Sequence, residues 1–198
     1  MWTNRVLCHG TVFLLAAIWC GNPQRAIAQP GETDVGDLSV MGGGAFGGGS
    51  HATVNGGAGI AFSRYGIALV DTSYIPLGNR TVQGWPDRST IRSSNLIDFG
   101  FDFNIRVPIK HHWEPYGIVG AGAIWNIIRV NAVTPVGVPV VRNFDQWNGA
   151  VHTGGGLRYY IGETWGIRGE CKVVGVIGGH VFTQLMVGFF HVTPPDWP

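Results

Sequence analysis

Histidine side chains are the first candidates for chemistry in this 198-residue chain. Nucleophilic cleavage of an ester needs a hydroxyl or thiol beside a histidine base, which a carboxylate orients. In a strand the residue two positions on lies on the same face, yet there His152 is followed by Gly154. His191 is followed by Thr193, close to a strand end. We therefore expect no enzyme, no catalytic residue and no cofactor.

Metal and phosphate sites have little support. His51 and His180 fall in the first and last links between the expected strands, and a closed sheet would bring these links together. Two histidines without a third kind of ligand do not make a metal site, so we predict none. The glycines of residues 42–49 match a phosphate-loop spacing, but neither a helix nor a Lys-Ser/Thr pair follows them.

Charged side chains alternate with apolar ones along residues 96–107 and 167–173. Because successive side chains of a strand point to opposite faces, each segment has one apolar and one charged face. Inside a closed sheet the charges can pair as a structural plug, or, as an alternative, line a path for protons or ions. The predicted lumen charge network consists of Asp98, Asp102, Arg106, Arg158, Arg168, Glu170 and Lys172.

Residues 1–28 have the layout of a secretory signal peptide. An apolar run over residues 12–20 precedes the small-residue triplet Ala26-Ile27-Ala28, which predicts cleavage after Ala28. The apolar run is shorter than the roughly 20 residues that a transmembrane helix needs. Trp19 stands where a lipidated Cys20 would need a small neighbour, which argues against a lipoprotein.

The charge balance of the mature chain is close to zero. The sequence has 13 Lys+Arg and 12 Asp+Glu, so loss of Arg5 and Arg25 with the signal leaves 11 minus 12, or −1. This balance does not favour a nucleic-acid partner. Only Cys171 remains after cleavage, which excludes an internal disulfide and makes it most simply a small apolar residue. We expect one domain over residues 29–192 and a C-terminal tail over 193–198.

The mature chain divides into eight strand-like stretches. The expected strands are residues 35–48, 52–63, 65–76, 93–108, 114–130, 148–162, 164–177 and 181–192. The second, fourth and sixth links are short, whereas the third and fifth, residues 76–93 and 131–148, are long. Alternate links share a rim, so the short ones lie together. This asymmetry is typical of outer-membrane barrels, which have brief periplasmic turns and longer external loops.

The space available inside a barrel decides which face of each strand points outward. An eight-stranded interior is only just wide enough to be filled by side chains, so rows of phenylalanine would overfill it. Facing lipid, the rings are favourable, and closure leaves no backbone group unbonded. The predicted fold is an all-β, eight-stranded antiparallel up-and-down transmembrane β-barrel. The predicted lipid-facing residues are Ile97, Phe99, Phe101, Phe103, Ile105, Leu185, Val187 and Phe189.

Aromatic residues near the strand ends predict a girdle at each membrane surface, because amphipathic rings prefer the headgroup level. The predicted girdle consists of Tyr74, Trp113, Tyr116, Trp125, Trp147 and Trp165.

The signal, the glycine-rich first strand and two segments near the C-terminus resemble small outer-membrane barrels of the OmpA/OmpX type. The segments are 154–160, Gly-Gly-Gly-Leu-Arg-Tyr-Tyr, and 165–170, Trp-Gly-Ile-Arg-Gly-Glu. The resemblance implies a monomeric barrel in the outer membrane of a Gram-negative-type bacterium, with outer-membrane lipid and the barrel-assembly machinery as partners. Such barrels usually end on an aromatic residue, whereas here residues 191–198 follow Phe190.

Two functions stay open at this stage. The favoured one is a structural, anchoring or surface-interaction role in the cell envelope, through external loops at residues 76–93 and 131–148. Val138, Val140 and Val141 give the second loop an adhesive or strand-extending character. The alternative is a narrow, porin-like channel or transporter, and a lipid-modifying barrel enzyme is the weakest reading.

Overall fold

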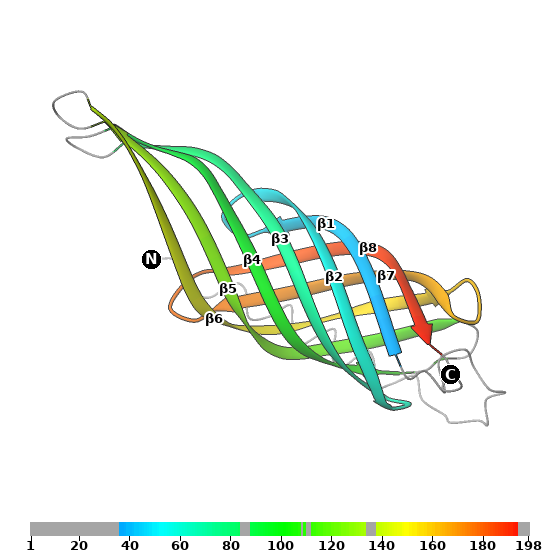
Figure 1. The fold of residues 1–198 in the computed structure, drawn as a ribbon. Helices are drawn as coiled ribbons and strands as arrows, with labels where there is room; N and C mark the ends of the chain where they lie inside the picture. Colours follow the sequence, from blue (N-terminus) through cyan, green and yellow to red (C-terminus); the bar gives the residue numbers. More distant parts are fainter. Residues whose placement is uncertain (1–35, 84–87, 108, 110–111, 134–137, 194–198) are drawn as a thin grey trace, which may run out of the picture.

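The chain closes into a single β-barrel in which each strand pairs with its neighbours in sequence. The computed structural model describes residues 36–83, 88–107, 109, 112–133 and 138–193. Its strands are β1 (Gly36–Phe46), β2 (Ser50–Ser63), β3 (Gly66–Gln83), β4 (Arg88–Arg106), β5 (Trp113–Val133), β6 (Pro139–Tyr160), β7 (Trp165–Val176) and β8 (Val181–Thr193). All neighbouring pairs are antiparallel, including β1 with β8, as Figure 1 shows. The predicted eight-stranded all-β barrel is confirmed.

Two predicted boundaries lie at the ends of the described chain. The signal peptide, residues 1–28, falls outside the described residues. Thr193, the first residue of the expected tail, is the last residue of β8, and residues 194–198 are also outside the description. No helix in the described part of the chain is long and apolar enough to cross a membrane.

Charges face inward and apolar side chains face outward along the strands. On β4, Phe101 is 49% exposed whereas its neighbour Asp102 is 1% exposed. A soluble protein would show the reverse, so this outer surface suits hydrocarbon rather than water. Of the predicted lipid-facing side chains, Ile97 is half-buried and the others are exposed: Phe99, Phe101, Phe103, Ile105, Leu185, Val187 and Phe189.

The two long links are not loops, which corrects the expectation for residues 76–93 and 131–148. β3 and β4 pair up to Gln83 and Arg88, and β5 and β6 pair up to Val133 and Pro139. Four strands therefore continue past the barrel as a sheet, visible at the upper left of Figure 1. We call this sheet, residues 76–83, 88–95, 127–133 and 139–149, the β3–β6 extension.

The sequence does not predict the extension, because its strands lack the alternation of apolar and polar residues that is typical of a half-buried strand. Residues 141–147 of β6 are exposed on both faces, so nothing selects apolar side chains for one of them. Pro76 and Gly78 coincide with register shifts against β4, and they read as loop residues in the sequence. The expected parity of the links holds, since the extension and the short turns lie at opposite rims.

The extension has two outer edges. β3 pairs with β2 only as far as Tyr74, and β6 pairs with β7 only from Ala150 onward. Within the described residues, β3 beyond Tyr74 and β6 before Ala150 therefore each have a strand partner on one side only.

Five of the six residues of the predicted aromatic girdle lie on the outer surface. Tyr74, Ile97, Trp125 and Trp147 are successive register partners across β3 to β6, and the two tryptophan rings stack with centroids 5.4 Å apart. Trp113 and Trp165 are exposed near the short-turn rim.

The prediction for Tyr116 is wrong, because this side chain is only 5% exposed and lies inside the barrel. It shares the inward face of β5 with Glu114 and Ile118, so the parity of the strand overrides its position near the strand end.

Inward-facing glycines make room for the interior side chains. A Cβ on Gly120 of β5 would lie 2.5 Å from the carbonyl oxygen of Phe101 and would clash with the Asp102 carboxylate, whereas one on Gly117 would meet nothing within 4 Å. We expect Gly120→Ala to lower the free energy of unfolding by about 1–3 kcal/mol, the usual cost of overpacking. Gly117→Ala, on the same strand, should change it little. Urea unfolding in lipid vesicles measures both, and equal stabilities for the two variants would contradict this account of the interior.

Candidate functional site

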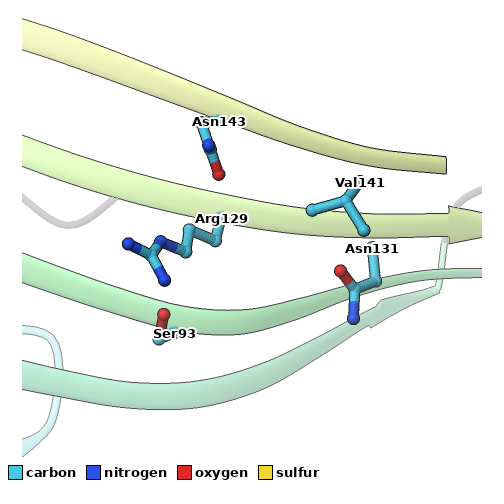
Figure 2. A pocket seen from close by; sticks show the side chains of 5 residues that line it. All are labelled: Ser93, Arg129, Asn131, Val141 and Asn143. Atoms are coloured by element: carbon cyan, nitrogen blue, oxygen red, sulfur yellow. The ribbon is translucent and has the colours of Figure 1, made fainter.

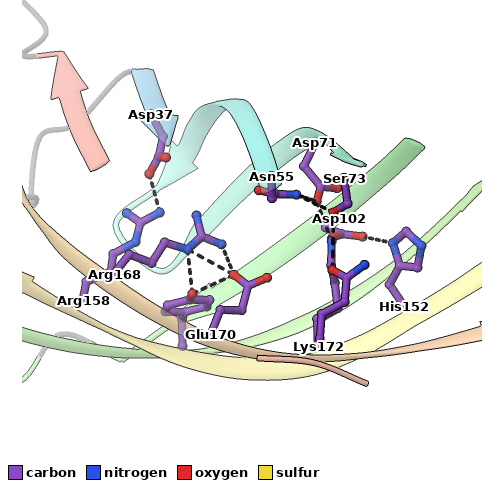
Figure 3. A network of polar contacts seen from close by, with 12 residues as sticks. Asp37, Asn55, Asp71, Ser73, Asp102, His152, Arg158, Arg168, Glu170 and Lys172 are labelled. Atoms are coloured by element: carbon purple, nitrogen blue, oxygen red, sulfur yellow. Dashed lines mark hydrogen bonds and ion pairs between the residues drawn. The ribbon is translucent and has the colours of Figure 1, made fainter. Parts of the chain in front are cut away.

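The structure places all seven residues of the predicted charge network inside the barrel. Asp98, Asp102, Arg106, Arg158, Arg168, Glu170 and Lys172 are all buried. They fall into two groups along the barrel, one around Lys172 and one around Arg158 and Arg168 (Figure 3). Four further buried residues with ionisable side chains, which the sequence analysis did not include, complete the groups: Asp37, Asp71, Glu114 and His152.

The first group surrounds the Lys172 ammonium of β7. Its Nζ donates to Asp71 on β3 and, at 3.2 Å, to Asp102 on β4. His152 of β6 lies between two carboxylates, with Nδ1 2.7 Å from Asp102 and Nε2 3.3 Å from Asp98. Residues from four strands thus meet around the Lys172 ammonium.

Neutral side chains extend the first group to the remaining wall. Asn55 donates through Nδ2 to Asp71 at 2.7 Å and to the Ser73 hydroxyl at 2.9 Å. Ser73 of β3 donates in turn to Gln184 of β8 at 3.3 Å. The bond from Ser73 connects two strands that do not pair with one another.

The second group lies nearer the short turns. Arg168 forms an ion pair with Glu170 and donates to the Tyr116 hydroxyl at 2.6 Å, while Tyr116 donates to Glu170 at 2.8 Å. Arg158 of β6 forms an ion pair with Asp37 of β1. Tyr116 therefore supports a charge pair, which gives it a structural role in the interior.

The remaining arginine of the network, Arg106, lies at the short-turn end of β4. Its guanidinium is 3.7 Å from Glu114 and donates to the backbone oxygen of Ser63 at 3.0 Å. Glu114 is also 3.6 Å from the Arg158 guanidinium, so one carboxylate lies close to two arginines.

The contacts span the lumen rather than run along one wall. In the closed strand order β3 and β7 lie four strands apart, as opposite walls of the barrel, and Lys172 connects them through Asp71. The Arg158–Asp37 pair connects β6 with β1, three strands away. An arrangement of this kind fills the cross-section and holds opposite strands together.

The additional residues share a simple signal that could have revealed them. Asp37, Asp71 and Glu114 are each the only charged residue on the inward face of their strand within the barrel, and His152 shares the inward face of β6 with Arg158. The predicted network took the strands with several inward charges, β4 and β7, together with Arg158 of β6, and left out the strands with one inward charge each.

Asp71, Asp102 and His152 bring three metal-type ligand atoms within 4.8 Å of one another. Lys172 donates to both carboxylates, so its ammonium already supplies the positive charge that a metal ion would bring. His51 and His180 line the same hollow at the mouth of the barrel.

A second hollow lies on the outer face of the β3–β6 extension. It has a volume of about 590 Å³ and is shown in Figure 2. Four of its lining side chains are polar, and Arg129 carries the one charge among them; the five are Ser93, Arg129, Asn131, Val141 and Asn143. We call this site the polar hollow. Four of its five lining residues lie in the segments 76–93 and 131–148, which were expected to bind a ligand, whereas Arg129 lies at the end of the expected strand 114–130.

Comparison with solved structures identifies the architecture. The N-terminal β-barrel domain of Pseudomonas aeruginosa OprF matches with a TM-score of 0.53 and 12% identity, over 81% of this chain and 98% of that domain. A major outer membrane protein from Thermus thermophilus matches with a TM-score of 0.53 and 10% identity, over 80% and 99%. The fold is that of an eight-stranded outer-membrane β-barrel. The resemblance drawn from the sequence is confirmed at this level.

A third match is Ail, the attachment invasion locus protein of Yersinia pestis, with a TM-score of 0.51 and 10% identity, over 82% of this chain and 99% of that one. No protein-family model matches the sequence, and no curated protein matches it either. At these identities the matches establish the fold alone, so the function has to be argued from the residues.

Lys172 is the cation whose loss should affect the barrel most. In Lys172→Met the carboxylates of Asp71 and Asp102 would stay buried without their ammonium, so we expect a loss of about 3–5 kcal/mol in the free energy of unfolding. The double variant Lys172→Met/Asp71→Asn should regain part of it. Arg142→Met, at an exposed position of β6, is the control and should cost less than about 0.5 kcal/mol. Urea unfolding in vesicles that leaves Lys172→Met as stable as the parent would overturn the assignment.

Proposed function

We propose that the barrel is an anchor in the outer membrane of a Gram-negative-type bacterium and that the β3–β6 extension is its interaction surface. The observation that carries this proposal is the exposure of both faces of β6 over residues 141–147. A sheet without a packed face contributes little to the stability of the barrel, so its formation points to a role outside the barrel. The proposal includes export by the N-terminal signal and insertion by the barrel-assembly machinery.

The polar hollow gives the surface a chemical preference. Arg129 offers a planar guanidinium that can donate two parallel hydrogen bonds to a sulfate or phosphate group, and Asn131 and Asn143 add amide groups. Val141 adds one apolar contact. We propose an anionic saccharide as the ligand of this hollow. Ail, which shares the fold at 11% identity and a TM-score of 0.51, has been crystallised in complex with the heparin analogue sucrose octasulfate.

The cross-lumen ion pairs support a plugged barrel over the alternative of a narrow channel or transporter. A conducting lumen would need space between opposite walls, where Lys172 contacts Asp71 and Arg158 contacts Asp37. The proposal assigns no catalytic activity, since both ring nitrogens of the buried His152 already face carboxylates.

Substitution of Arg129 tests the interaction surface. For intact cells that display the protein, we expect Arg129→Gln to weaken binding to immobilised heparin by about tenfold, the value of one hydrogen bond between charged groups. Arg142→Gln removes the same charge from the opposite face of the extension and should have a smaller effect. Equal losses in the two variants would indicate unspecific attraction and would contradict a site at the polar hollow.

Conductance separates the anchor from the channel. The purified protein, with folding verified by its faster gel migration before boiling, should give no unitary current steps in planar bilayers. A porin in the same bilayers serves as the positive control. Regular steps that depend on protein concentration would favour the channel.

A further inference from the structure

The mouth of the barrel holds an apolar hollow that neither the plug nor the extension explains. It has a volume of about 450 Å³, within the range of about 300–1,000 Å³ of small-ligand pockets. β1, β2, β3, β4 and β8 and the β1–β2 and β7–β8 turns contribute to its wall. The lining includes Ala45, Phe46, Ile75, Leu77, Leu96 and Phe182. We call this site the apolar cup.

The interior beneath the cup is apolar as well. Ile124, Ala150 and Val174 form a buried cluster, and Leu96 and Phe182 pack against it. On β3, β4, β6, β7 and β8 the next inward position is polar, as at Asp98 after Leu96. The barrel thus changes from paired charges to an apolar lining at the end that opens outward. A concave apolar surface of this kind marks a binding site more often than a structural need.

The rim of the cup carries hydrogen-bonding groups and no acid. His51 of β2 and His180 of the β7–β8 turn line it, together with the Ser94 hydroxyl. Among the described residues that line the cup, none is acidic. The rim can therefore donate to an anionic group without an opposing carboxylate.

The cup lies at the level where lipid headgroups are expected. Ile75 and Leu96 of its lining adjoin Tyr74 and Ile97, which lie on the outer surface in register with Trp125 and Trp147. β1, β2, β7 and β8 end near the cup, whereas β3 to β6 continue past it (Figure 1). The wall is consequently low on the side of the β1–β2 and β7–β8 turns, where a molecule from the outer membrane surface can approach.

From these observations we infer that the apolar cup binds a single-chain amphiphile with an anionic headgroup, of the fatty-acid type. The acyl chain packs against Leu96, Phe182 and the apolar floor, and the carboxylate accepts hydrogen bonds from His51 and His180. Binding of the amphiphile in the cup is favoured over its staying in the bilayer. Both surround the acyl chain with apolar groups, but only the cup adds His51 and His180 as hydrogen-bond donors for the carboxylate. This site is separate from the polar hollow, so it goes beyond the proposed function.

Photocrosslinking locates the site directly. The probe is decanoate with a terminal diazirine, added to the full-length protein in lipid nanodiscs, with unlabelled decanoate as competitor. We expect competable labels on inward residues such as Leu96 and Phe182. Leu77→Glu, which places a charge beside the chain at a half-buried position, should abolish these labels while the folded gel mobility is kept. Labels confined to outward residues such as Phe99, or unchanged labelling in Leu77→Glu, would overturn the inference.

The headgroup is tested with the double variant His51→Gln/His180→Gln. Its affinity for decanoate should fall by about tenfold, as for the loss of hydrogen bonds to a charged group, while that for the neutral probe decanol stays within about twofold. His191→Gln, an exposed histidine at the opposite rim, is the matched control and should match the parent. Equal affinities of the parent for decanoate and decanol, or an unchanged double variant, would overturn the role of the two histidines.

Discussion

The structure depends on one constraint: a strand surrounded by hydrocarbon must have all its backbone hydrogen bonds made by other strands. Pairing of β8 with β1 meets this constraint by removing the last edge from the sheet. Closure with only eight strands then fixes a narrow interior, which in turn requires glycines such as Gly120 and limits what can be placed inside. The outward phenylalanines and the inward charges are two results of the same geometry.

The charges inside the barrel contact one another. Among the described residues, six buried carboxylates (Asp37, Asp71, Asp98, Asp102, Glu114 and Glu170) are accompanied by four Arg and Lys side chains and His152. Ion pairs in such surroundings gain little net stability over well-packed apolar residues, but removing one partner is costly. A cation can therefore serve more than one acid, as Lys172 does for Asp71 and Asp102. Loss of one member therefore costs more than the intact network contributes.

The barrel could be predicted from sequence because burial on one face imposes a period of two. Residues 96–107 alternate so regularly that strand, face and lipid orientation all follow from them. The prediction was wrong where no face of the strand is buried or where the alternation was not applied. The extension has no buried face, so its strands read as loops, and Tyr116 was assigned from its distance to a strand end instead of its parity. Solitary inward residues such as Asp37 give no run to detect. Their partners are known only once distant strands are brought together.

The outer edges of the extension set a limit on how deeply the protein is immersed. Beyond Tyr74 on β3 and before Gly149 on β6, whose carbonyl oxygen still accepts a hydrogen bond from the Ile177 amide, backbone groups on one side of each strand need water as their partner. Hydrocarbon cannot provide one, so the ceiling of the apolar layer must lie at or below Tyr74 and Gly149. The last residues whose backbone is hydrogen-bonded on both sides therefore limit the depth of insertion into the membrane. This limit comes from the backbone hydrogen bonds and adds to that set by the aromatic side chains.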